Sequence, residues 1–337
     1  MTIEFTVFKG SADGIVQATT RHDDPTGNQV LVRITHSGIC GTDEHFKYRD
    51  IVLGHEGVGT VEAIGERVIE LKVGDVVGWG YTHKTCGRCE QCELGQDQLL
   101  DCPTRERYGV SNHHQGSFGS HAIWDDSFLF KIPEGLAPED AAPLMCAGAT
   151  VFNVIETYDI RSTHRVGIIG VGGLGHLAIQ FLAKMGASVI VFSSTDSKRE
   201  ESMSLGATEF FATKGATKFE TAKIDHLLVT TSFQPDWKPF LKIMKPTGVI
   251  YPLTVDSGDL SIPFFPIVSY GLTIQGSSVG SRFVNRKMLD FAARHNIKPI
   301  LERFPLTKSG VEEGMAKLRE GKMRYRGVLV APTRAAL

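Results

Sequence analysis

The stretch Arg165-Val-Gly-Ile-Ile-Gly-Val-Gly-Gly-Leu-Gly-His176 passes from an apolar segment through closely spaced glycines into residues 177–185, which carry apolar side chains on one side of a helix. This order of strand, glycine turn and helix predicts a dinucleotide-binding unit. Gly170 permits the tight turn, Gly172 lets backbone amides approach a pyrophosphate, and Gly175 lets helix and strand pack closely. The candidate cofactor-binding residues of this loop are Gly170, Gly172, Gly173, Leu174 and Gly175.

The pattern of apolar, polar and glycine residues differs between the earlier and the later part of the chain. This difference predicts two architectures in one chain. From residue 165 onward, apolar strands, turns and amphipathic helices alternate, as they do in a doubly wound parallel sheet. Its strands are expected at residues 166–169, 188–192, 209–212, 226–230, 249–253 and 272–275. Before about residue 145, glycines separate short β-branched runs, which is typical of an irregular, barrel-like all-β domain. These runs lie at residues 30–34, 57–64 and 75–77.

The remaining sequence completes an expected three-part division of the 337 residues. Beyond residue 281 the pattern predicts helices at 284–295 and 311–320 and a last strand at 327–330. We expect this tail to return to the first domain. The expected parts are residues 1–150, 151–281 and 282–337.

Composition and charge exclude several classes of function. The 36 basic and 38 acidic residues give a net charge of −2, which provides no field for gathering nucleic acid or an anionic bilayer. No stretch approaches the ~18 uncharged apolar residues of a membrane span. Residues 1–10 lack a basic segment followed by an apolar run. We therefore expect a cytoplasmic protein whose partner is a small molecule.

The end of the next expected strand indicates which dinucleotide binds. An acidic side chain at this position would hydrogen-bond the ribose 2′-hydroxyl of NAD. Here the strand ends in Ser193 and Ser194, and Lys198 and Arg199 follow as cationic partners for a 2′-phosphate. We therefore predict NADP(H). The alternative is NAD, bound through Asp196 if its carboxylate reaches the ribose.

Four of the six cysteines lie close together, at Cys86, Cys89, Cys92 and Cys102. Six cysteines are too few for a secreted disulfide framework, and this spacing suits tetrahedral zinc bound by four thiolates. A closed site of this kind leaves no position for a substrate, so its role would be structural. Free or redox-active thiols are the alternative interpretation.

The other two cysteines belong to a second possible donor set. Cys40 and Cys146 lie far apart in the sequence, with His55 and Glu56 between them. A catalytic zinc needs about three protein ligands from cysteine and histidine, and one open position. A buried cysteine or histidine by itself is usually only part of a core.

Several motifs in one order carry a resemblance to a known family. They are Cys40-Gly-Thr-Asp43, Gly54-His-Glu56, the four-cysteine segment, Cys146-Ala-Gly-Ala-Thr150 and the glycine loop. Together they resemble the zinc-dependent medium-chain dehydrogenase/reductase family over nearly the whole chain. Residues 115–118, 143–148 and 193–201 are most similar to its cinnamyl-alcohol-dehydrogenase branch. The resemblance implies a GroES-like β-barrel catalytic domain, an inserted Rossmann doubly wound domain and a C-terminal return.

The resemblance also implies roles for individual residues. The ligands of the catalytic zinc fall on Cys40, His55 and Cys146, with Glu56 as an alternative ligand. Thr42 is the expected hydroxyl of a proton relay, and His45 is the histidine that passes the proton to solvent through the cofactor ribose. Alternatively, Thr42 satisfies a turn and His45 simply lies at the surface. Further candidates for cofactor binding are Thr150, Thr231 and Ser278.

Two spacings depart from the family pattern. Cys40 and His55 are separated by 14 residues, fewer than usual, so a loop near the substrate pocket is shortened and substrate preference does not transfer. Cys92 and Cys102 are separated by nine residues, more than usual, and Leu100 occupies the usual position of the fourth ligand. A bulge in this loop would still bring Cys102 to the position of the fourth ligand. If Cys102 does not reach this position, the structural zinc would be weakly bound or absent.

The resemblance implies a zinc-dependent, NADPH-dependent alcohol dehydrogenase that acts mainly as an aldehyde reductase. Zinc would polarise the aldehyde carbonyl, and Thr42 would protonate the alkoxide that forms as hydride arrives. The alternatives are a polyol or secondary-alcohol dehydrogenase, a reductase of C=N or conjugated C=C bonds, and a nucleotide-binding scaffold without catalysis. A homodimer paired through the strand at 272–275 is also expected.

Overall fold

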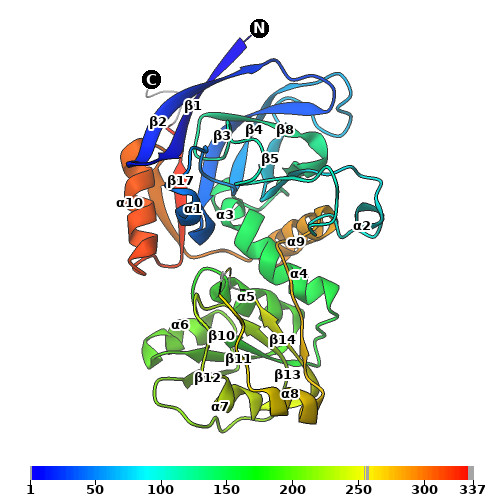
Figure 1. The fold of residues 1–337 in the computed structure, drawn as a ribbon, viewed down its shortest axis with the longest axis vertical. Helices are drawn as coiled ribbons and strands as arrows, with labels where there is room; N and C mark the ends of the chain where they lie inside the picture. Colours follow the sequence, from blue (N-terminus) through cyan, green and yellow to red (C-terminus); the bar gives the residue numbers. More distant parts are fainter. Residues whose placement is uncertain (1, 254, 256–257, 333–337) are drawn as a thin grey trace. The chain divides into compact units, whose positions relative to one another are not determined.

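The computed structural model describes residues 2–253, 255 and 258–332, so the last five residues of the expected C-terminal part lie outside it. The chain divides into two compact units, which we call unit 1 (Met1–Ala149 with Gly280–Leu337) and unit 2 (Thr150–Val279). In Figure 1 the blue-to-cyan and orange-to-red elements belong to unit 1, and most of the green and yellow elements to unit 2. Both ends of the chain therefore contribute to one unit.

Unit 1 is built on a seven-stranded sheet with the order β16-β17-β3-β4-β5-β9, in which β8 also pairs with β3. The pairs are antiparallel except β16 with β17. Because β17 pairs with β3, the C-terminal segment completes a sheet that the N-terminal segment begins. The strands are β3 (Gln29–Ile39), β4 (Gly57–Ile64), β5 (Val76–Trp79), β8 (His121–Asp125), β9 (Phe130–Lys131), β16 (Leu301–Pro305) and β17 (Arg326–Val330).

A hairpin of β1 (Thr2–Ser11) and β2 (Gly14–Asp23) forms a second sheet in unit 1, and β6 (Thr82–Lys84) with β7 (Glu106–Arg107) forms a third. Phe5 and Val7 of β1 are fully buried while Thr6 between them is exposed, so the hairpin packs one face against a small core with Leu31, Val52 and Ile123. The helices of unit 1 are α1 (Gly41–Phe46), α2 (Glu90–Glu93), η1 (Asp126–Phe128), α3 (Pro138–Pro143), η2 (Leu144–Gly148), α9 (Arg282–His295) and α10 (Lys308–Arg319).

Unit 2 is a six-stranded parallel sheet with the order β12-β11-β10-β13-β14-β15. The strand order reverses at β10, which is where doubly wound sheets bind ligands. The strands are β10 (Arg165–Ile169), β11 (Ser188–Ser193), β12 (Glu209–Ala212), β13 (Ile224–Val229), β14 (Met244–Pro252) and β15 (Thr273–Ile274). The helices are α4 (Ala149–Thr157), α5 (Gly175–Met185), η3 (Asp196–Lys198), α6 (Arg199–Ser204), α7 (Trp237–Leu241) and α8 (Phe264–Tyr270).

The two predicted architectures are confirmed, and each of the six predicted strands of the parallel sheet is present. The edge strand is shorter than expected, because β15 keeps only Thr273–Ile274 of the predicted residues 272–275. The β1–β2 hairpin and β16 were not predicted, since both carry many polar residues along with their apolar ones. Within the described residues, no helix combines the length and the apolar character needed to cross a membrane.

A buried histidine lies in the sheet of unit 2. His226 on β13 is 7% exposed, with Nε2 at 2.9 Å from Nδ1 of His164 and Nδ1 at 3.2 Å from the hydroxyl of Tyr251. Burial first, and then the neighbouring His164, lower the pKa of His226 to about 4. The other charged groups that act on it are Asp225 and Asp159, which raise its pKa, and Lys245, which lowers it.

We expect the free energy of unfolding to fall as the pH drops from about 6.5 towards about 4. Histidines of the unfolded chain take up a proton near pH 6.5, whereas folded His226 does so only near its pKa of about 4. Acid therefore favours the unfolded state by up to about 1.4 kcal/mol per pH unit through this group. Chemical unfolding at about pH 7 and about pH 5 should show a larger loss for the wild type than for His226→Gln. Equal losses would contradict a lowered pKa.

Candidate active site

Cys40, His55, Glu56 and Cys146 come from three separate segments and converge in unit 1. Cys40 directly precedes α1, His55 and Glu56 directly precede β4, and Cys146 lies in η2. One donor atom from each of the four residues lies within 4.8 Å of the others. We call this group the Cys40 cluster. It brings together two thiols, an imidazole and a carboxylate.

The pairing of β3 with β4 places the first two of these segments side by side. Ser37 pairs with Gly57 across the two strands, and the Gly38 N–H donates to the carbonyl of Glu56 at 2.9 Å. A Cβ atom on residue 38 would lie 1.8 Å from Oε2 of Glu56. A glycine is therefore needed at this position for Glu56 to reach the cluster.

Asp43 fixes the orientation of His55. Its carboxylate is fully buried, and Oδ1 lies 3.0 Å from Nδ1 of His55. Its other oxygen, Oδ2, accepts a hydrogen bond from the backbone N–H of Cys40 at 2.9 Å. Burial opposes a charge on the imidazole, but Asp43 and Cys40 outweigh it and raise the pKa of His55. Because a carboxylate only accepts hydrogen bonds, Nδ1 carries a proton and Nε2 is left for another partner.

The chemistry of the Cys40 cluster fits zinc. Nε2 of His55 is buried and has no hydrogen-bond partner within the described part of the chain. The neighbouring thiol of Cys146 lowers the pKa of Cys40, whereas Cys40 and burial raise the pKa of Cys146. Metal binding would release the proton that remains on the pair. Thiolates and imidazole nitrogen are ligands that zinc prefers. The cluster is therefore a suitable zinc site.

Arg326 on β17 pairs with the carboxylate of Glu56 inside the same region. The guanidinium Nη2 donates to both carboxylate oxygens, and both side chains are buried. Burial is the main cause that raises the pKa of Glu56 to about 7, while Arg326 acts in the opposite direction. Sequence analysis did not find Arg326, because no motif or spacing connects it to a residue so far away in the chain.

The two predicted relay residues lie on α1 and differ in their positions. Thr42 is half-buried, with Oγ1 at 3.7 Å from the sulfur of Cys40. His45 is exposed on the same helix. The structure therefore brings Thr42 next to the Cys40 cluster and places His45 at the surface.

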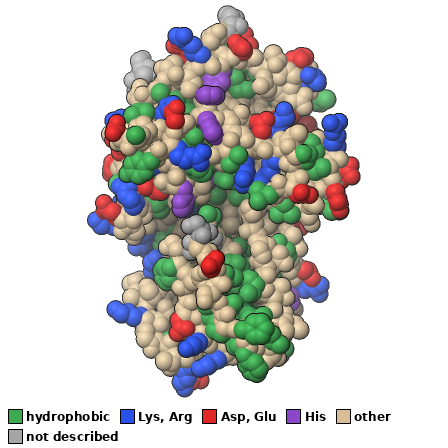
Figure 2. Space-filling view, viewed as in Figure 1, with side chains coloured by type: hydrophobic (Ala, Val, Ile, Leu, Met, Phe, Trp, Pro, Cys, Tyr) green, Lys and Arg blue, Asp and Glu red, His purple; other side chains and the backbone are tan. Residues whose placement is uncertain are grey.

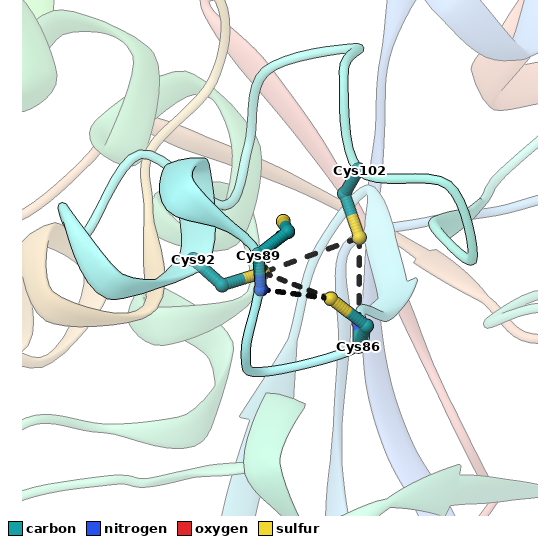
Figure 3. Close-up of side chains that lie close together, drawn as sticks. All are labelled: Cys86, Cys89, Cys92 and Cys102. Carbon is teal, nitrogen blue, oxygen red and sulfur yellow. Dashed lines mark hydrogen bonds between the residues drawn. The ribbon is translucent and has the colours of Figure 1, made fainter.

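The other four cysteines form a second cluster, in which Cys102 takes part (Figure 3). The sulfur of Cys92 on α2 lies 3.9, 3.5 and 4.0 Å from those of Cys86, Cys89 and Cys102. The backbone N–H of Arg88 is the main cause that lowers the pKa of Cys86 to about 6. Leu100 is exposed and takes no part, so the longer loop delivers Cys102 as the fourth donor. The arrangement fits a closed four-thiolate zinc site.

Asp97 anchors the longer loop of this cluster to α9. Its carboxylate is buried and accepts hydrogen bonds from the backbone N–H and the side-chain Nε of Arg282, at 3.1 and 2.5 Å. Arg282 is the first residue of α9. Asp97 therefore holds the longer loop between Cys92 and Cys102 in place. Sequence analysis did not identify this ion pair.

The predicted glycine loop lies between β10 and α5 in unit 2. Gly170 has a φ of +95°, which favours glycine, and a Cβ atom on Gly175 would lie 2.0 Å from the carbonyl oxygen of Gly170. A Cβ atom on Gly172 would have no atom within 4 Å, so its backbone is open to a ligand. Thr231 lies beside this turn, because a Cβ atom on Gly170 would be 2.7 Å from its methyl group. This geometry suits a pyrophosphate at the start of α5.

The side chains expected to select the cofactor lie near this loop. Lys198 donates through Nζ to the carbonyl oxygen of Val171, so its ammonium group is close to the glycine turn. Ser193 ends β11 and is buried, and Ser194 follows it. The carboxylate of Asp196 pairs with Arg199 at 2.6 Å. The remaining candidates, Thr150 on α4 and Ser278 near the end of unit 2, have no described hydrogen bond to the glycine loop, and their role stays a prediction.

Comparisons with known proteins agree with these features. The alcohol dehydrogenase GroES-like domain matches residues 26–134, and the zinc-binding dehydrogenase domain matches residues 173–294. The chain is 34% identical over 311 residues to the aldehyde reductase AdhA of Synechocystis sp., which covers 90% of this chain and 91% of that protein.

Two solved structures are similar over almost the whole chain. A cinnamyl alcohol dehydrogenase from Sorghum bicolor has a TM-score of 0.85 at 30% identity and covers 98% of both chains. A CAD from Helicobacter pylori complexed with NADP(H) has a TM-score of 0.87 at 25% identity and covers 98% of this chain and 99% of that one. The expected GroES-like and Rossmann domains are thus confirmed, as is the enzyme class. The chain belongs to the zinc-dependent alcohol dehydrogenases of the medium-chain dehydrogenase/reductase family.

Proposed function

We propose that this chain is an NADP(H)-dependent alcohol dehydrogenase that acts mainly as an aldehyde reductase. The observation that carries the proposal is the donor set of buried His55 with half-buried Cys40 and Cys146, and the Thr42 hydroxyl beside it. The similarity to an aldehyde reductase supports the direction of the reaction. The substrate is an alcohol or aldehyde small enough to bind at this cluster.

Each residue of the Cys40 cluster has a proposed role. Cys40, His55 and Cys146 would hold the zinc ion, and Glu56 would be an alternative ligand. When bound, the ion supplies Lewis-acid stabilisation of negative charge on the substrate oxygen. A bound NADPH would supply the hydride chemistry, and Oγ1 of Thr42 would donate the proton that this oxygen takes up. In our proposal the exposed His45 returns a proton from solvent to Thr42.

We expect the purified protein to oxidise NADPH in the presence of an aromatic aldehyde, and Cys40→Ser to lower the turnover by at least about 100-fold. Serine stays protonated at neutral pH and is a poor zinc ligand, whereas the cysteine thiolate is a good one. Far-UV circular dichroism of the variant controls for folding. Wild-type turnover by Cys40→Ser would refute the zinc mechanism.

The same assay separates the alternative functions. A polyol or secondary-alcohol dehydrogenase would turn over a ketose faster than an aromatic aldehyde. A C=N or C=C reductase would leave both carbonyl compounds unchanged but oxidise NADPH with an imine or an enal. Binding of NADPH without turnover of any of these compounds would indicate a scaffold. The proposal predicts that the aromatic aldehyde is the preferred substrate.

We propose NADP(H) as the cofactor because the groups at the end of β11 suit a phosphate. Ser193 and Ser194 offer hydroxyls, and the ammonium group of Lys198 is held near the glycine turn. The ion pair of Asp196 with Arg199 directs that carboxylate to a cation of its own segment, which supports its exclusion from the ribose. The NADP(H) complex of the similar CAD from Helicobacter pylori supports the same choice.

We expect Lys198→Ala to raise the KM for NADPH about 10-fold and to change the KM for NADH by less than about 2-fold, because a charge-assisted hydrogen bond to phosphate is lost. Lys184→Ala is the matched control, since Lys184 is exposed near the opposite end of α5. Steady-state kinetics with both cofactors measure the effect. An equal increase for NADPH and NADH would show that Lys198 does not read the 2′-phosphate.

We also propose that the chain forms a homodimer through the edge of the parallel sheet. β15 is an edge strand, and the preceding α8 exposes Phe264, Phe265 and Val268 by 80%, 77% and 62%. Figure 2 shows hydrophobic side chains gathered over the part of unit 2 that contains α8. An exposed apolar patch next to an unpaired strand edge is a suitable surface for a second copy.

Sedimentation velocity tests the dimer. We expect the wild type to sediment as a dimer and Phe265→Asp to sediment as a monomer, since the charge would be buried without a partner in the interface. Ile69→Asp, on an exposed residue of unit 1, is the control and should leave the dimer intact. A monomeric wild type, or an unchanged dimer in Phe265→Asp, would rule out this surface.

A further inference from the structure

Tyr108 packs directly against a residue of the Cys40 cluster. It follows β7 and is 2% exposed. Its ring stacks on the imidazole of His55, with ring centroids 4.7 Å apart and an interplanar angle of 29°. Its hydroxyl oxygen accepts a hydrogen bond from the backbone N–H of Gly54 at 3.1 Å. The tyrosine therefore contacts both the ring of His55 and the backbone just before it.

The hydroxyl of Tyr108 holds the backbone that leads into His55. Its oxygen accepts the N–H of Gly54, the residue directly before His55. The Asp43 carboxylate holds Nδ1 of the same imidazole and also accepts the backbone N–H of Cys40.

The hydrogen bond from Gly54 to Tyr108 is buried, so the backbone N–H has no access to water. A buried donor that loses its acceptor costs free energy. Without the hydroxyl, the backbone directly before His55 would be free to shift. This shift would loosen the hold of Asp43 on Nδ1 and let the imidazole rotate away from the cluster.

We propose that Tyr108 is a positioning residue for the metal site: its ring sets the plane of the His55 imidazole, and its hydroxyl, by holding the N–H of Gly54, keeps Nε2 turned toward the Cys40 cluster. The inference rests on the proposed role of His55 as a zinc ligand. Tyr108 touches neither the substrate nor the cofactor in this role. Its effect is on how firmly the site holds its metal.

The test compares zinc release from the wild type and from Tyr108→Phe, which keeps the stacked ring and removes the hydroxyl. Release to a colorimetric chelator should show two phases in the wild type, and the phase from the four-cysteine cluster is the one missing in Cys102→Ser. In Tyr108→Phe we expect zinc release from the Cys40 cluster to be about 10-fold faster. Loss of a residue that supports a metal ligand typically lowers the metal affinity by at least that factor. The four-cysteine phase should be unchanged, which also shows that the variant is folded.

Tyr81→Phe is the matched control. The ring of Tyr81 also contacts His55, edge-on with centroids 5.8 Å apart, so the variant removes the hydroxyl of a second tyrosine that packs on the same imidazole. We expect it to release zinc at the wild-type rate. The inference is overturned if Tyr108→Phe releases zinc like the wild type, or if it accelerates both phases equally, which would indicate a general loss of stability. A wild type with only the four-cysteine phase would overturn the proposed function instead, and this inference with it.

Discussion

The active site depends on one buried carboxylate, Asp43. It joins the start of α1 to the segment before β4 by binding the backbone of Cys40 with one oxygen and the ring of His55 with the other. Burying a charge costs free energy, so such a group persists only where donors hold it firmly. The geometry of two proposed zinc ligands from different elements is therefore set by a third residue, Asp43.

The two cysteine clusters show how similar donors support different roles. The four-cysteine cluster offers four sulfur donors and no other group, and Asp97 of its loop binds Arg282 on α9. The Cys40 cluster has fewer thiols, and both oxygens of its carboxylate are held by Arg326. A donor set of this kind leaves room for a substrate oxygen, whereas four thiolates do not.

Local patterns were predictable from the sequence, and contacts between distant segments were not. The glycine loop and the four-cysteine segment carry their signal within a few neighbouring residues, so both were found, including Cys102 despite its unusual spacing. Arg326 meets Glu56 only because β17 pairs with β3. Tyr108 meets His55 through tertiary packing alone. No sequence pattern distinguishes Arg326 from the other arginines of the chain, or Tyr108 from the other tyrosines.

X-ray absorption at the zinc K-edge of the purified protein tests the central claim most directly. The account predicts a mixed shell of sulfur at about 2.3 Å and nitrogen at about 2.0–2.1 Å. The sulfur comes from both clusters, and the nitrogen is Nε2 of His55. A shell of sulfur alone would mean that only the four-cysteine cluster holds zinc, and it would contradict the account.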